Sequence, residues 1–90
     1  MGIVRLRREG LAWSDIGGET ILLDLETSTY FAAKGAGSFL LGCLVEGIDE
    51  ALLADRLAEH FEVDPDVAQQ DTAEFLRDLE QRHLLERVHA

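Results

Sequence analysis

The sequence predicts an α+β domain in which a three-stranded antiparallel sheet is followed by three helices, the order found in a winged helix-turn-helix. Two features of the sequence support this. Apolar and polar residues alternate with a period of two from residue 11 to residue 33. After residue 33 the apolar residues recur with a period of about 3.6, which is typical of amphipathic helices. A chain of 90 residues can bury one small core, so we expect a single domain over residues 1–90.

A β-hairpin opens the predicted sheet. Residues 11–16 alternate, and Gly17-Gly18 accepts the positive φ values that a two-residue hairpin loop requires. The second strand is predicted over residues 19–25. Its aliphatic side chains share one face, which we expect to be covered: Ile21, Leu23 and Leu25.

The two ends of the chain are also patterned. Residues 3–8 alternate, which fits either a fourth strand or an ordered N-terminal arm. Residues 84–88 are apolar enough to pack back on the core. We therefore expect the C-terminal segment to lie against the core, and the structure of the N-terminal segment stays open.

The third strand forms an edge of the predicted sheet, because no later segment is patterned to cover it. An edge strand presents unpaired N–H and C=O groups, to which a second polypeptide can add as a further strand. This edge is therefore a predicted peptide-binding site, and it consists of Ser28, Thr29, Tyr30, Phe31, Ala32 and Ala33.

Three helices follow the sheet. The first is predicted over residues 36–46, with Gly47 placed to end it. Asp49 is a natural N-cap for the second helix. The third begins at Pro65, because proline at the first helical position lacks only an N–H that would be unpaired anyway, and it runs to about His83.

The third helix carries two neighbouring stripes of side chains. One stripe is predicted to face the core: Ala68, Thr72, Phe75, Leu76 and Leu79. The other is acidic with an apolar start: Val67, Asp71, Glu74 and Asp78. Charged residues on the outer face of a helix are most often only solvated, so this stripe is either a solvated face or a binding surface.

The charge of the chain limits its partners. It has 8 Lys and Arg against 18 Asp and Glu, a formal net charge of −10. This charge repels nucleic acid and anionic membranes and favours a partner that carries Lys or Arg. A single cysteine and the absence of a signal-peptide pattern predict a cytoplasmic protein.

Catalysis and metal binding are not expected. Cys43 lies on the apolar stripe of the first helix, where a small core residue is the simpler interpretation than a nucleophile. His60, His83 and His89 have no metal-ligand spacing. We expect no enzyme activity, no cofactor and no metal.

Several short motifs together resemble one family. They are Leu23-Asp24-Leu25, Tyr30-Phe31, Gly37, Gly47, Asp71-Thr72 and Leu84-Leu85. Their order and spacing resemble the PqqD-like proteins, the small peptide-recognition domains of pathways that modify ribosomally made peptides. The family often has Leu-Asn before the first helix, a Trp within it and a Gly before the paired leucines. This chain instead has Ala33-Lys34, Leu41 and His83, which fits a divergent stand-alone member. A free-standing, acidic chain of this length resembles the leader-recognition protein of lasso peptide biosynthesis.

The resemblance implies a non-catalytic adaptor. Such domains hold the leader of a precursor peptide as a strand antiparallel to the third strand, in a groove whose other wall is the third helix. They hand the leader to a tailoring enzyme, which in lasso pathways is a cysteine peptidase. The edge strand would supply the hydrogen-bond ladder, and the third helix would supply the remaining contacts, apolar ones from Val67, Phe75 and Leu79 and polar ones from Asp71, Glu74 and Asp78.

Two alternatives stay open. A dimerisation or scaffold module would use the same edge strand to pair two copies of the chain, giving a homodimer. An enzyme would need a cluster of polar groups, which the sequence does not reveal.

Overall fold

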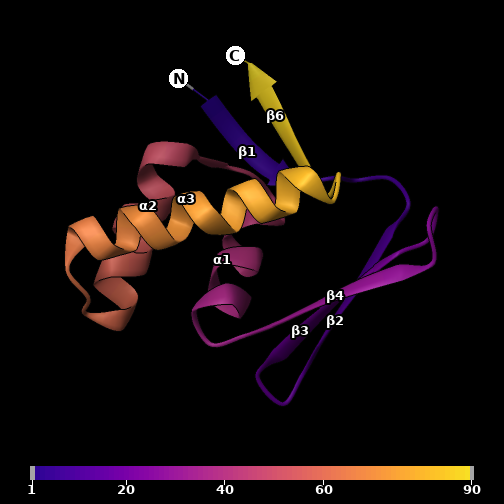
Figure 1. Cartoon of the computed structure of the whole chain (residues 1–90), viewed down its shortest axis with the longest axis horizontal. Helices are drawn as coiled ribbons and strands as arrows, with labels where there is room; N and C mark the ends of the chain where they lie inside the picture. The colour runs from indigo at the N-terminus through magenta and orange to yellow at the C-terminus, as the bar shows by residue number, and fades with distance from the viewer. Residues whose placement is uncertain (1, 90) are drawn as a thin grey trace.

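The computed structural model describes residues 2–89, which form two small antiparallel sheets and three helices (Figure 1). One sheet has the strand order β2-β3-β4, built from Leu11–Ile16, Glu19–Asp24 and Thr29–Lys34. The other has the order β5-β1-β6, built from Ile48–Asp49, Gly2–Leu6 and Leu85–His89. The predicted α+β class, with a three-stranded sheet and three helices, is confirmed. Met1, Ala90 and the side chain of His89 lie outside the described part.

The predicted hairpin joins β2 to β3. Gly17 and Gly18 have φ values of 60° and 83°, as the two central residues of a type I′ turn require. The register runs without a bulge from Ile16 opposite Glu19 to Leu11 opposite Asp24. This regular register sets which backbone groups of the sheet are paired.

The prediction of the buried face of β3 was wrong. Leu22 is 1% exposed and faces the helices, whereas Leu23 and Leu25 are 41% and 58% exposed. The neighbours of Leu22 on the buried face are polar but have partners: the Thr20 hydroxyl bonds to that of Ser38, and Asp24 pairs with Arg7. An apolar pattern alone selects the wrong face because it does not count polar residues whose hydrogen bonds are satisfied.

The N-terminal segment is a strand, but it belongs to the second sheet. β1 lies between β5 and β6 and pairs with both in antiparallel register. An ion pair of 2.9 Å between Arg5 Nε and Glu86 Oε2 joins β1 to β6. Figure 1 shows these two strands side by side, with both ends of the chain at the same end of the molecule. The predicted packing of residues 84–88 is thus observed, with Leu84 in the core and the following residues paired to β1 as strand β6.

The helices begin close to where the sequence predicts them. They are α1 (Ala36–Leu44), α2 (Glu50–Phe61) and α3 (Pro65–Gln81). The Asp49 carboxylate accepts a hydrogen bond from the Ala51 N–H, which confirms the predicted cap of α2. α3 ends two residues before His83, which takes a φ of 60° as the chain turns into β6.

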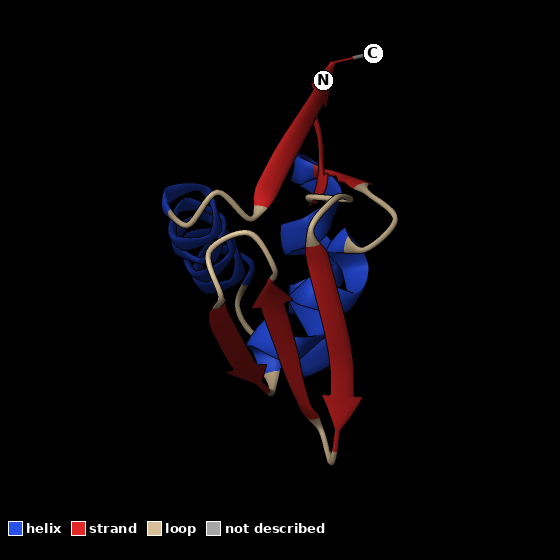
Figure 2. Ribbon diagram, turned by 90° about the vertical axis from the view of Figure 1, so that its right-hand side faces the viewer, coloured by secondary structure: helices blue, strands red, loops and turns tan. Residues whose placement is uncertain are grey.

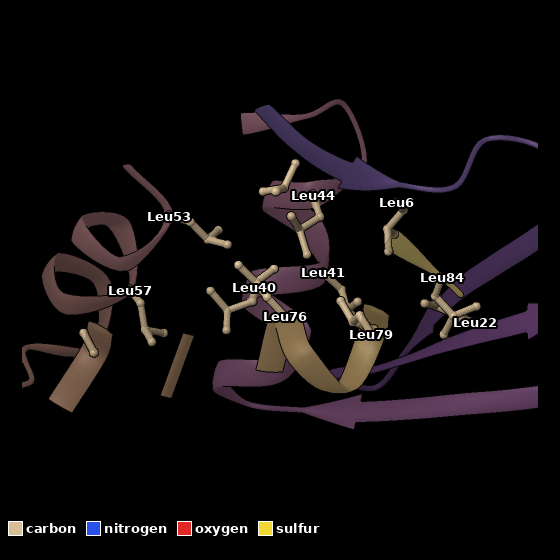
Figure 3. Packing of buried hydrophobic residues seen from close by; sticks show 12 residues of the cluster. Leu6, Leu22, Leu40, Leu41, Leu44, Leu53, Leu57, Leu76, Leu79 and Leu84 are labelled. Carbon is tan, nitrogen blue, oxygen red and sulfur yellow. The ribbon is translucent and has the colours of Figure 1, made fainter. Parts of the chain in front are cut away.

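The core lies between the β2-β3-β4 sheet and the three helices, with α1 at its centre (Figure 3). Leucines from all three helices, from both sheets and from the turn before β6 fill it: Leu6, Leu22, Leu40, Leu41, Leu44, Leu53, Leu57, Leu76, Leu79 and Leu84. The predicted core face of α3 is buried except for Phe75, which is half-buried. No helix within residues 2–89 is long and apolar enough to cross a membrane.

Candidate functional site

The strand β4 is an edge of its sheet, as the sequence predicts. It pairs only with β3 among the described strands, and Figure 2 shows it at one border of the sheet, with α3 beside it and β2 at the opposite border. A strand at the border of a sheet uses only half of its backbone groups in the ladder. The other half faces outward.

The hairpin register identifies the outward groups of β4. A two-residue loop is closed by a hydrogen-bonded pair, here Ile16 and Glu19, and hydrogen bonding then alternates along the strands. The Leu25 N–H donates to the Gly10 carbonyl oxygen at 2.8 Å, in line with this alternation. The residues of β3 whose backbone groups point to β4 are therefore Thr20, Leu22 and Asp24.

The residues of β4 that lie opposite these three already have their backbone groups hydrogen-bonded to β3. Thr29, Phe31 and Ala33 direct their N–H and C=O groups toward β3. Tyr30, Ala32 and Lys34 direct theirs to the open edge. The sequence predicted that residues 28–33 would all supply hydrogen bonds to a guest strand, whereas only alternate residues of β4 have backbone groups that face outward. Ser28 is a correction, because its N–H already donates to the Asp24 carbonyl oxygen at 2.8 Å in the β3–β4 turn.

Two aromatic rings join β4 to α3. Phe31 points to the helix side of the sheet, and its ring centroid lies 6.0 Å from that of Phe75 in an edge-to-face contact. The Arg82 guanidinium carbon lies 5.0 Å from the centre of the Phe31 ring, close enough for a cation–π contact. Arg82 is held by Asp78, with 2.9 Å between Arg82 Nε and Asp78 Oδ1. We use the name β4–α3 groove for the surface between β4 and α3 that these four side chains form.

Gly37 leaves room at the floor of the groove. A Cβ atom at this position would lie 3.0 Å from the Ala33 Cβ and 3.3 Å from the Phe75 ring. Contacts this short force neighbours to move. Glycine therefore allows the start of α1 to approach β4 without displacing Phe75. This gives a physical reason for a residue that the sequence motif contains.

A hollow of about 240 Å³ opens at one end of the groove. Its lining comes from β3, the start of β4 and the end of α3, and includes Leu22, Thr29, Phe31, Arg82 and Leu84. Apolar side chains, hydroxyl groups, the Asp24 carboxylate and the Arg82 guanidinium therefore surround a space that can receive a side chain from a neighbouring segment.

The ion pair of Arg7 with Asp24 fixes the walls of this hollow. Arg7 Nη2 lies 2.9 Å from Asp24 Oδ1, and Arg7 Nη1 donates to the His83 carbonyl oxygen at 2.9 Å. The Asp24 carboxylate also accepts a hydrogen bond from the Glu26 N–H at 3.0 Å. The Arg7 hydrogen bond is the main reason that the pKa of Asp24 falls to about 2. One buried pair therefore ties the β3–β4 turn to the turn that follows α3.

Most of the predicted helix residues lie on the stripe that borders the groove. Val67 is 49% exposed, Asp71 and Glu74 are exposed, and Asp78 is half-buried. Spacings of three and four residues place them in line with Phe75 and Arg82. Leu79 is a correction, since it is fully buried and belongs to the core beneath the groove.

Arg82 is the groove residue that sequence reasoning missed. The acidic pattern of the stripe drew attention to its carboxylates, but Arg82 follows Asp78 at a spacing of four and so shares its face. Lys34 was missed as well, because the predicted strand stopped at Ala33. The groove is thus not purely acidic.

Cys43 and His60 lie away from the hollow beside β4, and both line a different hollow. Cys43 packs half-buried against the core, and burial raises the pKa of its thiol. His60 stacks on Phe39, with 4.3 Å between the ring centroids. Within residues 2–89, no three Cys, His, Asp or Glu side chains gather in a way that could hold a metal ion.

Residues 19–85 match the family described as coenzyme PQQ synthesis protein D (PqqD). The chain belongs to the PqqD family. The matched segment contains both walls of the β4–α3 groove and the glycine at its floor. The predicted PqqD-like assignment is therefore confirmed. No curated protein sequence matches the chain.

Two solved structures resemble this PqqD-family chain. One is TbiB1 in complex with the TbiA(beta) leader peptide, which is 30% identical with a TM-score of 0.83 and aligns over 96% of this chain and 98% of that chain. The other is lasso peptide synthetase B1 complexed with the leader peptide, 22% identical with a TM-score of 0.79 over 92% and 96% of the two chains. Because the second structure is only 22% identical, its similarity shows a shared fold and nothing more.

Proposed function

We propose that this PqqD-family chain binds the leader of a ribosomally made precursor peptide as a strand added to β4, and that it catalyses no reaction itself. The observation that carries the proposal is the open edge at Tyr30, Ala32 and Lys34, directly beside the β4–α3 groove. Support also comes from TbiB1, a relative of 30% identity that is solved with a leader peptide. The whole chain, residues 1–90, would act as one binding domain.

The open edge supplies affinity with little sequence preference. Each outward residue offers one N–H and one C=O to the guest, and such hydrogen bonds contribute about 0.5–1.5 kcal/mol each. Alternate side chains of an added strand point to the same face, about 7 Å apart. Those on the helix side of the sheet enter the groove, where the rings of Phe31 and Phe75 favour apolar groups.

The acidic stripe adds selectivity. Val67 lies two helical turns before Phe75, about 12 Å along the axis of α3, and Asp71 lies between them. These residues would contact the part of the leader that continues past the end of β4. Hydrogen bonds from leader hydroxyl or basic groups to Asp71, Glu74 or Asp78 are worth about 1.5–3 kcal/mol when partly desolvated, and less where the carboxylate is exposed.

The adaptor role completes the proposal. A bound leader held in one register can be presented to the enzyme that removes or modifies it, and in a lasso peptide pathway that enzyme is a cysteine peptidase. Precursor peptides are made by ribosomes, so we place this step in the cytoplasm. The strong negative charge of the chain fits a peptide or protein partner with basic residues better than nucleic acid or membrane.

Amide hydrogen exchange with and without a synthetic leader tests this proposal. We expect slower exchange at Tyr30, Ala32 and Lys34, because a new strand would cover N–H groups that now face solvent. The amides of Thr29, Phe31 and Ala33 already bond to β3 and should change little. Unchanged exchange at the outward positions under saturating leader would contradict strand addition to β4.

A further inference from the structure

The strand β2 is a second open edge of the same sheet. It pairs only with β3 among the described strands, and the alternation that frees Tyr30 and Ala32 on β4 frees the backbone groups of Leu11, Trp13 and Asp15 on β2. Edge strands are commonly protected by a bulge, a proline or a lysine. β2 has none of these, because its register is continuous and its sequence is LAWSDI.

A hollow of about 810 Å³ lies beside this edge, between β2 and the helices α1 and α2. Trp13 projects into it from the strand and remains 48% exposed. Opposite stand three rings in mutual contact: His60 lies on Phe39 at 4.3 Å, and Phe61 meets Phe39 edge-on at 5.6 Å. An open aromatic cluster of this kind is typical of a surface that binds another protein.

Glycines keep the hollow accessible. Gly18, Gly35 and Gly42 line it, and a Cβ atom built on any of them would meet nothing within 4 Å. The hollow therefore has space for side chains from a second segment. The arrangement resembles that of the β4–α3 groove, in that an open edge strand faces a helical wall across a hollow.

Charge indicates what kind of segment fits. Asp15 and Glu46 line the hollow with one cation, Arg56. The whole chain carries −10. An extended segment with an apolar side chain for the aromatic cluster and a basic side chain for Asp15 would complement the site. A second copy of this chain fits less well, since two chains of −10 repel each other.

We propose that an extended basic and apolar segment of the enzyme that processes the leader adds to β2 and inserts an apolar side chain between Trp13 and Phe61. This inference rests on the proposed function, since it names where the enzyme that receives the leader docks. β2 and β4 are separated by β3, about 10 Å apart across the sheet, so both edges can be occupied together. The adaptor would then hold substrate and enzyme on opposite borders of one sheet (Figure 2).

The test uses the full chain, a labelled synthetic leader and the leader-removing cysteine peptidase from the same gene cluster. Trp13→Ala removes the aromatic anchor, and Asp15→Lys reverses the charge at an exposed position, where misfolding is not expected. Leader affinity is measured by fluorescence anisotropy, and leader removal by mass spectrometry with the leader saturating the chain. Both variants should keep leader affinity within about twofold and slow leader removal by about tenfold or more.

Hydrogen exchange supplies an independent readout. Adding the peptidase to the leader-bound chain should protect the amides of Leu11, Trp13 and Asp15, which the leader alone should leave exposed. The inference would be overturned if the peptidase removed the leader at the wild-type rate in the presence of either folded variant. It would also be overturned if the peptidase did not slow amide exchange on β2. A light-scattering mass of a dimer that Trp13→Ala converts to a monomer would overturn it as well, because β2 would then bind a second copy. If the wild-type chain fails to bind the leader at all, the proposed function fails instead.

Discussion

The ring of Phe75 meets the ring of Phe31 edge-on, with 6.0 Å between the centroids, and this contact joins α3 to the open edge strand of the sheet. Because Arg82 lies over the same Phe31 ring, one aromatic side chain of β4 is held by two residues of the helix side. The contact sets the width of the β4–α3 groove. Changes to its surroundings should therefore affect binding as well as stability.

Gly37→Ala should narrow the groove and destabilise the domain. The added methyl would lie 3.0 Å from the Ala33 Cβ and 3.3 Å from Phe75. Overpacking lowers the free energy of unfolding by about 1–3 kcal/mol, and the better helix propensity of alanine raises it by up to about 1 kcal/mol. We expect a lower free energy of unfolding in urea and weaker leader binding. Gly42→Ala is the matched control in the same helix, because its Cβ would meet nothing; equal effects from both substitutions would rule out the steric explanation.

The acidic stripe should contribute to leader affinity through specific carboxylates. Asp71→Ala and Asp78→Ala should each raise the Kd for the leader by about threefold to tenfold, in line with a hydrogen bond to a partly exposed charge. Fluorescence anisotropy with a labelled leader measures this. Asp55→Ala is the control, since Asp55 is an exposed acidic residue on α2 and its loss changes the net charge equally. If all three variants bind alike, the stripe is only a solvated face.

The Arg7–Asp24 pair should make stability depend on pH in acid. The pKa of Asp24 is about 2 in the folded chain against an ordinary value of 3.8. A lowered folded-state pKa stabilises the fold above the ordinary value. This contribution is complete above about pH 5 and is lost as the pH falls through 2. Thermal unfolding of Asp24→Asn should show a lower Tm at neutral pH, and a difference from wild type that shrinks toward pH 2. A difference that stays constant with pH would contradict the assignment.

The leader complex should contain one copy of the chain for each leader. A leader strand on β4 occupies the backbone groups that a second copy would need for pairing through the same edge. Light scattering of the chain with excess leader should therefore give the mass of a 1:1 complex. A dimer that persists under saturating leader would favour the alternative in which β4 pairs two copies.

Local signals made most of the fold predictable. The Gly17-Gly18 turn, the Asp49 cap and the Pro65 start of α3 each depend on residues within a few positions, and each is where the sequence indicates. The second sheet was not predicted as such, because β1 pairs with β6 across about 80 residues of the chain. No local pattern encodes that pairing.

The site was less predictable than the fold, for a similar reason. The alternation of residues alone predicts the edge strand. Which residues of that strand have outward backbone groups, Tyr30 and Ala32 or their neighbours, depends on the hairpin register. The burial of Leu22 in place of Leu23 depends on hydrogen bonds of Thr20 and Asp24 to residues distant in sequence. Leu79 fits a groove and a core equally well by spacing, and only packing decides between them.

The affinity of Ala32→Pro for the leader tests the central claim most directly. Proline removes one N–H from the open edge of β4, where edge strands tolerate it, and leaves the ladder to β3 intact. Asp15→Pro is the matched control, because it removes an outward N–H from the opposite edge. We predict a Kd raised by about threefold to tenfold for Ala32→Pro and an unchanged Kd for Asp15→Pro. Equal leader affinity in wild type and in a folded Ala32→Pro variant would contradict leader binding by strand addition to β4.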